Sequence, residues 1–313
     1  MTGLPARVRI VEVGPRDGLQ NESAQIPTAE KIAFVNRLAQ AGHSTIEVSA
    51  FVSPKWVPQM ADAGEVFAGI TRKAGVRYTA LVPNLAGLAR AREARVDEIA
   101  IFAAASEAFS KRNINQSIAE SLATYKQVAD AARADGLRMR GYLSTGFGCP
   151  FDGPVPPAKV ADVAARLVDL GAYEVAVSDT IGIAHPGQVP DVVGEVSRRI
   201  PLAQIALHFH DTRGTALVNV LAGLQSGITA FDASAGGLGG CPYAPGAAGN
   251  LATEDLLYML DGLGIETGVS IEGVMEASRA IEPMLGHPLP SRVVRAARAT
   301  RAGPDACSDS LRC

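Results

Sequence analysis

Strand-like and helix-like segments alternate along this 313-residue chain, and the alternation restricts its fold more than any other feature. Short β-branched or apolar runs recur along the chain, bounded by turn residues and followed by segments with helical periodicity. The expected strands are 8–13, 45–48, 78–82, 98–102, 139–143, 174–177, 204–210 and 229–232. Eight strand–helix units in one chain predict an α/β fold with a parallel sheet closed into a (β/α)8 TIM barrel.

The helical segments define the expected domain limits. The expected helices are 28–40, 118–134, 160–170, 189–200, 250–260 and 271–284, with further helices beginning near residues 84 and 213. We therefore expect residues 1–289 to form one catalytic barrel domain that includes an additional C-terminal helix. Residues 290–313 are expected to form a partly flexible tail.

An open, doubly wound sheet is the alternative architecture for such alternation. The loop after the first expected strand, GPRDG at 14–18, lacks the glycine spacing of a dinucleotide-binding loop. We therefore favour the closed barrel and expect no nucleotide redox cofactor.

Composition argues against several classes of partner. The net charge is −3 and no Lys/Arg-rich run is present, so nucleic acid is not an expected partner. No apolar run reaches the roughly 18–20 residues of a membrane helix, so no membrane association is expected. Four scattered cysteines do not make a disulfide framework, which indicates a reduced, cytoplasmic setting.

A His-x-His pair, His208 and His210, ends the seventh expected strand. Side chains alternate along a strand, so two histidines one residue apart face the same side. Two imidazoles at the C-terminal end of a strand, just before a helix, indicate a metal site. The alternative is a pair of ordinary polar residues at a strand end.

Other polar side chains stand at the ends of expected strands, which all meet at one mouth of such a barrel. These residues are Arg16, Asp17, Glu47, Asp179, Cys241 and Asn250. With the two imidazoles they form a mixed set of nitrogen and oxygen donors. Such a set suits Mg²⁺ or Mn²⁺ in octahedral geometry better than tetrahedral Zn²⁺.

Most of these residues also have a structural alternative. Asp17 could hydrogen-bond the amides of its own turn, and Asp179 could be a turn or cap residue. Asn250 could cap the helix that follows it. Cys241 could be a small buried hydrophobe, the commonest role of a free cysteine.

Two further alternatives concern a strand and a loop. Glu47 lies within the apolar strand 45–48, so it should be buried and need a partner. Arg16 is the candidate for that partner, in a structural ion pair. The glycine-rich run 236–240 could be a phosphate cradle of backbone amides, although it lacks the Lys-Ser/Thr of a P-loop.

Six segments, in order along the chain, resemble the 3-hydroxy-3-methylglutaryl-CoA (HMG-CoA) lyase family. They are EVGPRDGLQNE (12–22), FVSPKWVPQM (51–60), SDTIG (178–182), HFHDT (208–212), GGLGGCPYA (236–244) and GNLATED (249–255). Arg-Asp-Gly and His-x-His alone would indicate only the wider group of barrel lyases and condensing enzymes. The Ser-Pro-Lys-Trp and Cys-Pro-Tyr segments narrow the resemblance to the lyases.

The resemblance implies the roles of individual residues. The implied ligands of a divalent metal, Mg²⁺ or Mn²⁺, are Asp17, His208, His210 and Asn250. The implied catalytic residues are Arg16, Cys241, Asp179 and Glu47. Arg16 and Gln20 are expected to contact the substrate, an acyl-CoA thioester, and the protein is expected to form a homo-oligomer, a dimer or larger.

The implied reaction is a reverse Claisen cleavage of HMG-CoA to acetyl-CoA and acetoacetate. A base takes the proton of the tertiary hydroxyl, and the sequence does not choose among Asp17, Glu47, Asp179 and a histidine. We expect Arg16 to stabilise the developing enolate oxygen and Cys241 to protonate the enolate carbon.

One position departs from the family pattern. The family usually carries Ser or Thr directly before the Phe-Val-Ser segment, where this chain has Ala50. Ser49 is one place earlier, and adjacent strand residues face opposite ways, so Ser49 is not expected to replace the missing hydroxyl.

Three other functions remain as alternatives. The first is a lyase for a longer, branched, isoprenoid-derived 3-hydroxyglutaryl-CoA. The second is a Claisen condensing enzyme of the same barrel group, which usually needs an additional C-terminal domain. The third is a non-catalytic metal-binding or scaffold protein, which the full set of site residues argues against.

Overall fold

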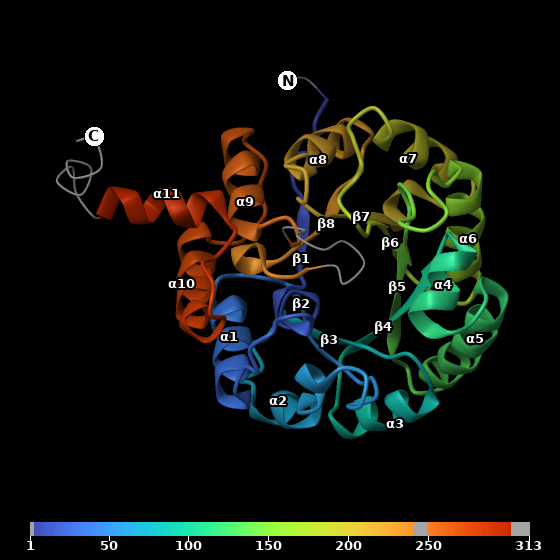
Figure 1. Ribbon diagram of the computed structural model, residues 1–313, viewed down its shortest axis with the longest axis horizontal. Coiled ribbons are helices and arrows are strands. Elements are labelled where there is room, and N and C mark those ends of the chain that lie inside the picture. The colour runs from blue at the N-terminus through green and yellow to red at the C-terminus, as the bar shows by residue number, and fades with distance from the viewer. Residues whose placement is uncertain (1–2, 241–248, 302–313) are drawn as a thin grey trace.

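The eight strands form one closed, parallel barrel (Figure 1). The computed structural model describes residues 3–240 and 249–301. Each strand pairs with the next in the chain, and the eighth closes the barrel against the first. The strands are β1 (Arg9–Glu12), β2 (Thr45–Ala50), β3 (Arg77–Leu81), β4 (Glu98–Ala104), β5 (Arg138–Ser144), β6 (Val175–Asp179), β7 (Ile205–Phe209) and β8 (Ala230–Ala233). The predicted (β/α)8 barrel is confirmed.

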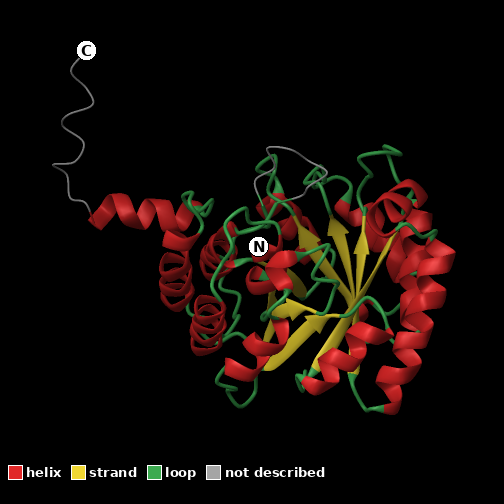
Figure 2. Ribbon diagram, turned by 60° about the horizontal axis from the view of Figure 1, so that its bottom comes forward, coloured by secondary structure: helices red, strands yellow, loops and turns green. Residues whose placement is uncertain are grey.

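Helices surround the barrel and cover its outer face (Figure 2). They are α1 (Thr28–Gln40), α2 (Ala63–Gly69), α3 (Leu85–Glu93), α4 (Glu107–Ile114), α5 (Ile118–Ala134), α6 (Pro157–Asp169), α7 (Val189–Ser197), α8 (Ala216–Gln225), α9 (Thr253–Gly262), α10 (Ile271–Ile281) and α11 (Arg292–Arg301). The sequence pattern did not predict α2 and α4. These helices have only 7 and 8 residues, which is too short for a clear periodicity.

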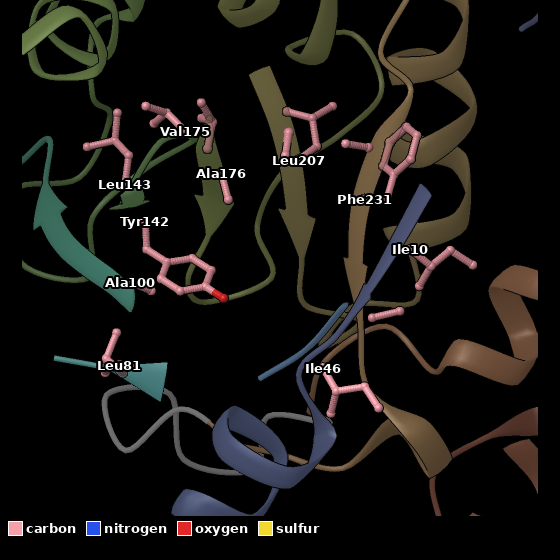
Figure 3. Close-up of a cluster of buried hydrophobic side chains, with 14 of the residues drawn as sticks. Ile10, Ile46, Leu81, Ala100, Tyr142, Leu143, Val175, Ala176, Leu207 and Phe231 are labelled. Carbon is pink, nitrogen blue, oxygen red and sulfur yellow. The ribbon is translucent and has the colours of Figure 1, made fainter. Parts of the chain in front are cut away.

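The core lies on both sides of the strands, because the helices bury the outer face and side chains fill the interior. All five residues of β6 are buried, for example. Figure 3 shows the alternation in β5, where Tyr142 and its neighbour Leu143 point to different sides of the strand. Strands buried on both faces read as continuous apolar runs, so an isolated polar residue within one must have a specific partner.

The C-terminal part extends beyond the barrel. The predicted additional helix is present as α10, which packs against α1. Helix α11 follows within the range for which a tail is expected, and the rest of that range, 302–313, lies outside the described residues. Among the described residues, no helix combines the length and hydropathy needed to cross a bilayer.

Candidate metal centre and active site

Arg16 and Asp17 lie in a π-helical turn, η1 (Gly14–Gly18), which follows β1 directly. The amides of Asp17 and Gly18 both donate to the carbonyl of Val13, at 2.8 and 3.1 Å. The turn therefore places two consecutive charged side chains at the barrel mouth. Single π-helical turns of this kind are frequent at functional sites.

Asp17 meets both histidines of the His-x-His pair at this mouth. His208 lies in β7 and His210 directly after it. One ligand atom from each of the three residues lies within 4.8 Å of the others. Both imidazoles are buried, and their ring centres are 5.2 Å apart. The tertiary structure thus brings Asp17 to two histidines that stand almost 200 positions later in the chain.

Asn250, the fourth predicted ligand, joins the same cluster. A β-bridge pairs it with His210. Its Nδ2 donates to Asp17 Oδ2 at 2.9 Å and to the carbonyl of Leu238 at 3.0 Å. The alternative of a helix cap is excluded because α9 begins only at Thr253, with Ala252 as its N-cap residue.

This cluster fits a divalent cation. The buried atoms Nδ1 of His210 and Oδ1 of Asn250 have no hydrogen-bond partner among the described residues, although buried polar atoms are normally paired. Burial opposes ionisation of Asp17, but Arg16 and then the two histidines hold the pKa of this carboxyl below its usual range. Burial, reinforced by His208, lowers the pKa of His210 to about 4, so this imidazole is neutral at pH 7.

Gly239 lies directly against the Asn250 carboxamide. Its φ is +121°, and a Cβ at this position would lie 2.5 Å from Asn250 Nδ2. We expect Gly239→Ala to displace the carboxamide and weaken Mn²⁺ binding by about 10-fold or more, measured by calorimetry on metal-free protein. Gly240→Ala is the matched control, because a Cβ there meets no described atom within 4 Å. Equal losses in both variants would show that the contact with Asn250 is not responsible.

Arg16 is held at the mouth by two carboxylates and a ring. Its Nε donates to Glu47 Oε2 and its Nη1 to Asp17 Oδ1, both at 2.6 Å, and its guanidinium lies 5.3 Å from the centre of the Tyr142 ring. Burial opposes the charge, yet Glu47 and Asp17 raise the pKa of Arg16 above its ordinary value. Arg16 is thus a permanent, oriented cation, and the ion pair considered as an alternative for Glu47 is present.

Asp232 in β8 is a site residue that sequence reasoning missed. Its Oδ2 lies 3.2 Å from His208 Nδ1, and its two oxygens accept hydrogen bonds from Arg140 at 2.7 and 3.1 Å. Burial opposes ionisation, but Arg140 lowers the pKa of Asp232 to about 2. The available signal was a single acid within an apolar strand, the same signal that identified Glu47.

Asp179 occupies a different environment from the metal cluster. Its two carboxylate oxygens accept hydrogen bonds from the amides of Ile183 and Ala184, at 2.9 and 3.0 Å. Burial raises its pKa to about 6, against these hydrogen bonds. The turn role considered for Asp179 is therefore present, and its carboxylate shapes the loop after β6.

A cavity of about 690 Å³ opens beside the cluster. Arg16, Asp17, Gln20 and both histidines line it, whereas Glu47 and Asp179 are not among the described residues that do. Sequence reasoning missed four polar lining residues from β5 and β6 and the loop after β6: Tyr142, Ser144, Ser178 and Thr180. Gln20 thus lies where a substrate contact was predicted, and its buried Oε1 has no hydrogen-bond partner among the described residues.

Ala50, the last residue of β2, is fully buried. The Ser49 hydroxyl donates to Met60 Sδ at 3.3 Å. A bulge between Glu47 and Ser49 interrupts the register with β3. Ser49 therefore does not replace the hydroxyl that the family usually carries at position 50.

The predicted catalytic Cys241 lies outside the described residues. The described part of its loop argues against a phosphate cradle, because the amides of Gly236, Gly237 and Leu238 already donate to other groups of the protein. Gly240, the last described residue before the cysteine, lines the cavity.

Comparison with known proteins identifies the family. The HMGL-like family model matches residues 7–281, most of the chain. The chain belongs to the HMGL-like family. The match runs from just before β1 to the end of α10, so the whole barrel and the first additional helix lie within the matched range.

Individual members of the HMGL-like family are closely similar to this chain. The 3-hydroxy-3-isohexenylglutaryl-CoA/hydroxymethylglutaryl-CoA lyase of Pseudomonas aeruginosa is 53% identical over 94% of this chain and 98% of its own length. The cytoplasmic HMG-CoA lyase of Rattus norvegicus is 51% identical over 95% of this chain and 86% of its own. An HMG-CoA lyase structure from A. baumannii, in complex with coenzyme A and 3-methylmalate, is 40% identical with a TM-score of 0.91, over 97% of this chain and 99% of that one.

Proposed function

We propose that this protein is a divalent-metal-dependent carbon–carbon lyase that cleaves HMG-CoA to acetyl-CoA and acetoacetate. The observation that carries the proposal is the meeting of Asp17, His208 and His210 beside the buried cation Arg16, at the edge of one large cavity. The names of the similar P. aeruginosa and rat proteins support the reaction. The coenzyme A in the similar A. baumannii structure supports an acyl-CoA substrate.

The proposed metal is Mg²⁺ or Mn²⁺, held by Asp17, His208, His210 and Asn250. A carboxylate, a carboxamide oxygen and imidazoles are donors that these ions accept, and no cysteine is in the described cluster. A bound cation would supply Lewis acidity towards substrate oxygens and hold them in place. Titration of Mg²⁺ and of Mn²⁺ into metal-free protein compares the affinities of the two ions.

The protein's own groups perform the remaining steps of the proposed reaction. Arg16 would stabilise the negative charge that develops on the thioester oxygen as the C2–C3 bond breaks. Its ion pair with Glu47 fixes the guanidinium before the substrate arrives, so no reorganisation is needed during the reaction. Glu47 thus acts by orienting Arg16.

Two proton transfers complete the scheme. Asp17 and His210 line the cavity, which supports them over Glu47 and Asp179 as the acceptor of the hydroxyl proton. Cys241 is proposed to return a proton to the carbon of the acetyl-CoA enolate. It directly follows Gly240, a cavity-lining residue, which supports this role.

One assay tests the reaction and its metal requirement. We expect the purified protein to release acetyl-CoA from HMG-CoA, to lose this activity after chelation, and to regain it with Mg²⁺ or Mn²⁺. A longer branched 3-hydroxyglutaryl-CoA is the parallel substrate, because the P. aeruginosa relative carries both names. A protein that cleaves neither thioester with metal present would contradict the proposed function.

Location and oligomeric state are two further expected properties. The cytoplasmic designation of the rat relative agrees with the cytoplasmic location expected from the scattered cysteines. A homo-oligomer, a dimer or larger, remains an expectation from the family resemblance, and light scattering of the purified protein tests it.

A further inference from the structure

A series of buried side chains with alternating charge lies behind the metal cluster. His208 contacts Asp232, Asp232 contacts Arg140, and Arg140 donates through Nε to Glu174 Oε1 at 2.7 Å. Arg9 donates to the other oxygen of Glu174. The first four of these residues are less than 8% exposed, so the interactions are poorly screened by solvent. Apart from His208, the reaction described above uses none of these residues.

The two nitrogens of His208 have different partners. Nδ1 lies 3.2 Å from Asp232 Oδ2, whereas Nε2 is directed towards the metal cluster, 4.0 Å from Asp17 Oδ2. The bidentate pairing with Arg140 keeps Asp232 a carboxylate, which can only accept a hydrogen bond. In the neutral imidazole, Nδ1 must therefore carry the proton, which leaves the Nε2 lone pair facing the cluster.

We propose that Asp232, held by Arg140, is a positioning residue that selects the His208 tautomer able to ligate the catalytic cation through Nε2. This inference rests on the proposed metal site. A carboxylate behind a metal-ligating imidazole fixes the ring and increases its basicity. Among the described residues, the carboxylate that acts on His210 is Asp17, which belongs to the cluster itself rather than lying behind the ring. Asp232 therefore acts on one of the two imidazoles.

Asp232→Asn should invert this arrangement. Arg140 has only donors, so it would take the carboxamide oxygen and turn the amide nitrogen towards His208. An amide N–H facing Nδ1 favours the imidazole with its proton on Nε2, and that proton blocks the lone pair needed by the metal. The corresponding substitution in a Ser-His-Asp triad gives a wrong tautomer in the same way.

Glu174→Gln is the matched control. It also removes one carboxylate charge from Arg140, but Glu174 does not contact His208. By calorimetry on metal-free protein, we expect Asp232→Asn to weaken Mn²⁺ binding by about 10–100-fold, and Glu174→Gln to bind as the wild type does. Nitrogen NMR of the imidazoles should show protonated Nδ1 on His208 in the wild type and protonated Nε2 in Asp232→Asn. Equal affinity losses in both variants, or no loss in Asp232→Asn, would overturn the proposal.

A second pair of variants covers the case in which Asp232→Asn does not fold because Arg140 is left without its partner. Arg140→Gln keeps the Asp232 carboxylate beside His208, so its Mn²⁺ affinity is the reference for the double variant. The double variant Asp232→Asn/Arg140→Gln should lose affinity relative to Arg140→Gln, and equal binding by the two would overturn the proposal. A wild-type protein that binds no Mn²⁺ would instead contradict the metal site itself and this inference with it.

Discussion

Replacing Arg16 with glutamine is expected to lower kcat for HMG-CoA cleavage by about 10²–10³-fold with little change in KM. The reason is that the guanidinium is fixed by Glu47 and Asp17 before the reaction and is proposed to meet charge that develops only in the transition state. Steady-state kinetics at saturating metal measure this. A rise in KM with kcat preserved would instead place Arg16 in ground-state binding.

Arg16→Lys is the matched control for this variant. Lysine keeps the positive charge but lacks the planar fork that donates to two carboxylates at once. We expect kcat to lie between those of the wild type and Arg16→Gln. A lysine variant as slow as the glutamine variant would show that the geometry of the fork matters more than the charge.

Replacing Asp17 with asparagine is expected to have the largest effect on metal binding. The change removes the one anionic oxygen of the cluster at nearly constant shape. Removal of a group that only supports a ligand is expected to weaken metal binding by about 10–100-fold, and the loss of Mn²⁺ affinity in Asp17→Asn should be larger than that. Titration of Mn²⁺ and of Mg²⁺ into metal-free protein measures it and compares the two ions.

Asp211→Asn is the control for a loss of local negative charge. Asp211 follows His210 directly, but its carboxylate accepts from the amide of Ala216 and from Arg292. We expect its metal affinity to match that of the wild type. If Asp17→Asn also binds metal normally, the proposed ligand set is wrong.

Side-chain alternation and the strand–helix pattern explain why much of the site could be predicted. The spacing of His208 and His210 indicated that both face the same side of a strand, and Glu47 was recognised as an acid within an apolar strand. The same reasoning could have identified Asp232, which has an equivalent signal in β8. It did not: Asp232 ends the expected strand 229–232, but only Cys241 and Asn250, beyond that strand, were considered there.

Two other features could be recognised only in the folded structure. Asp179 and Ser178 are adjacent in sequence, yet Ser178 lines the cavity and Asp179 binds the amides of its own loop. The π-helical turn at Gly14–Gly18 also has no periodicity that a five-residue sequence could display. The conformation of the Asp179 loop and that of this turn each depend on local hydrogen bonds, which the sequence does not display.

By itself, the sequence of this protein determined the closed barrel, the mouth at which the site lies and most of the cluster, including Asp17, His208, His210 and Asn250. The barrel and its mouth follow from local periodicities and from the rule that parallel strands end on the same side, and the choice of these four residues follows from the family resemblance. The sequence also offered Arg16 as the partner of Glu47. Only the tertiary structure decided that Arg16 pairs with Asp17 as well, and that Asp232 joins His208 to Arg140. These contacts depend on register, strand tilt and side-chain rotamers, which no local pattern encodes.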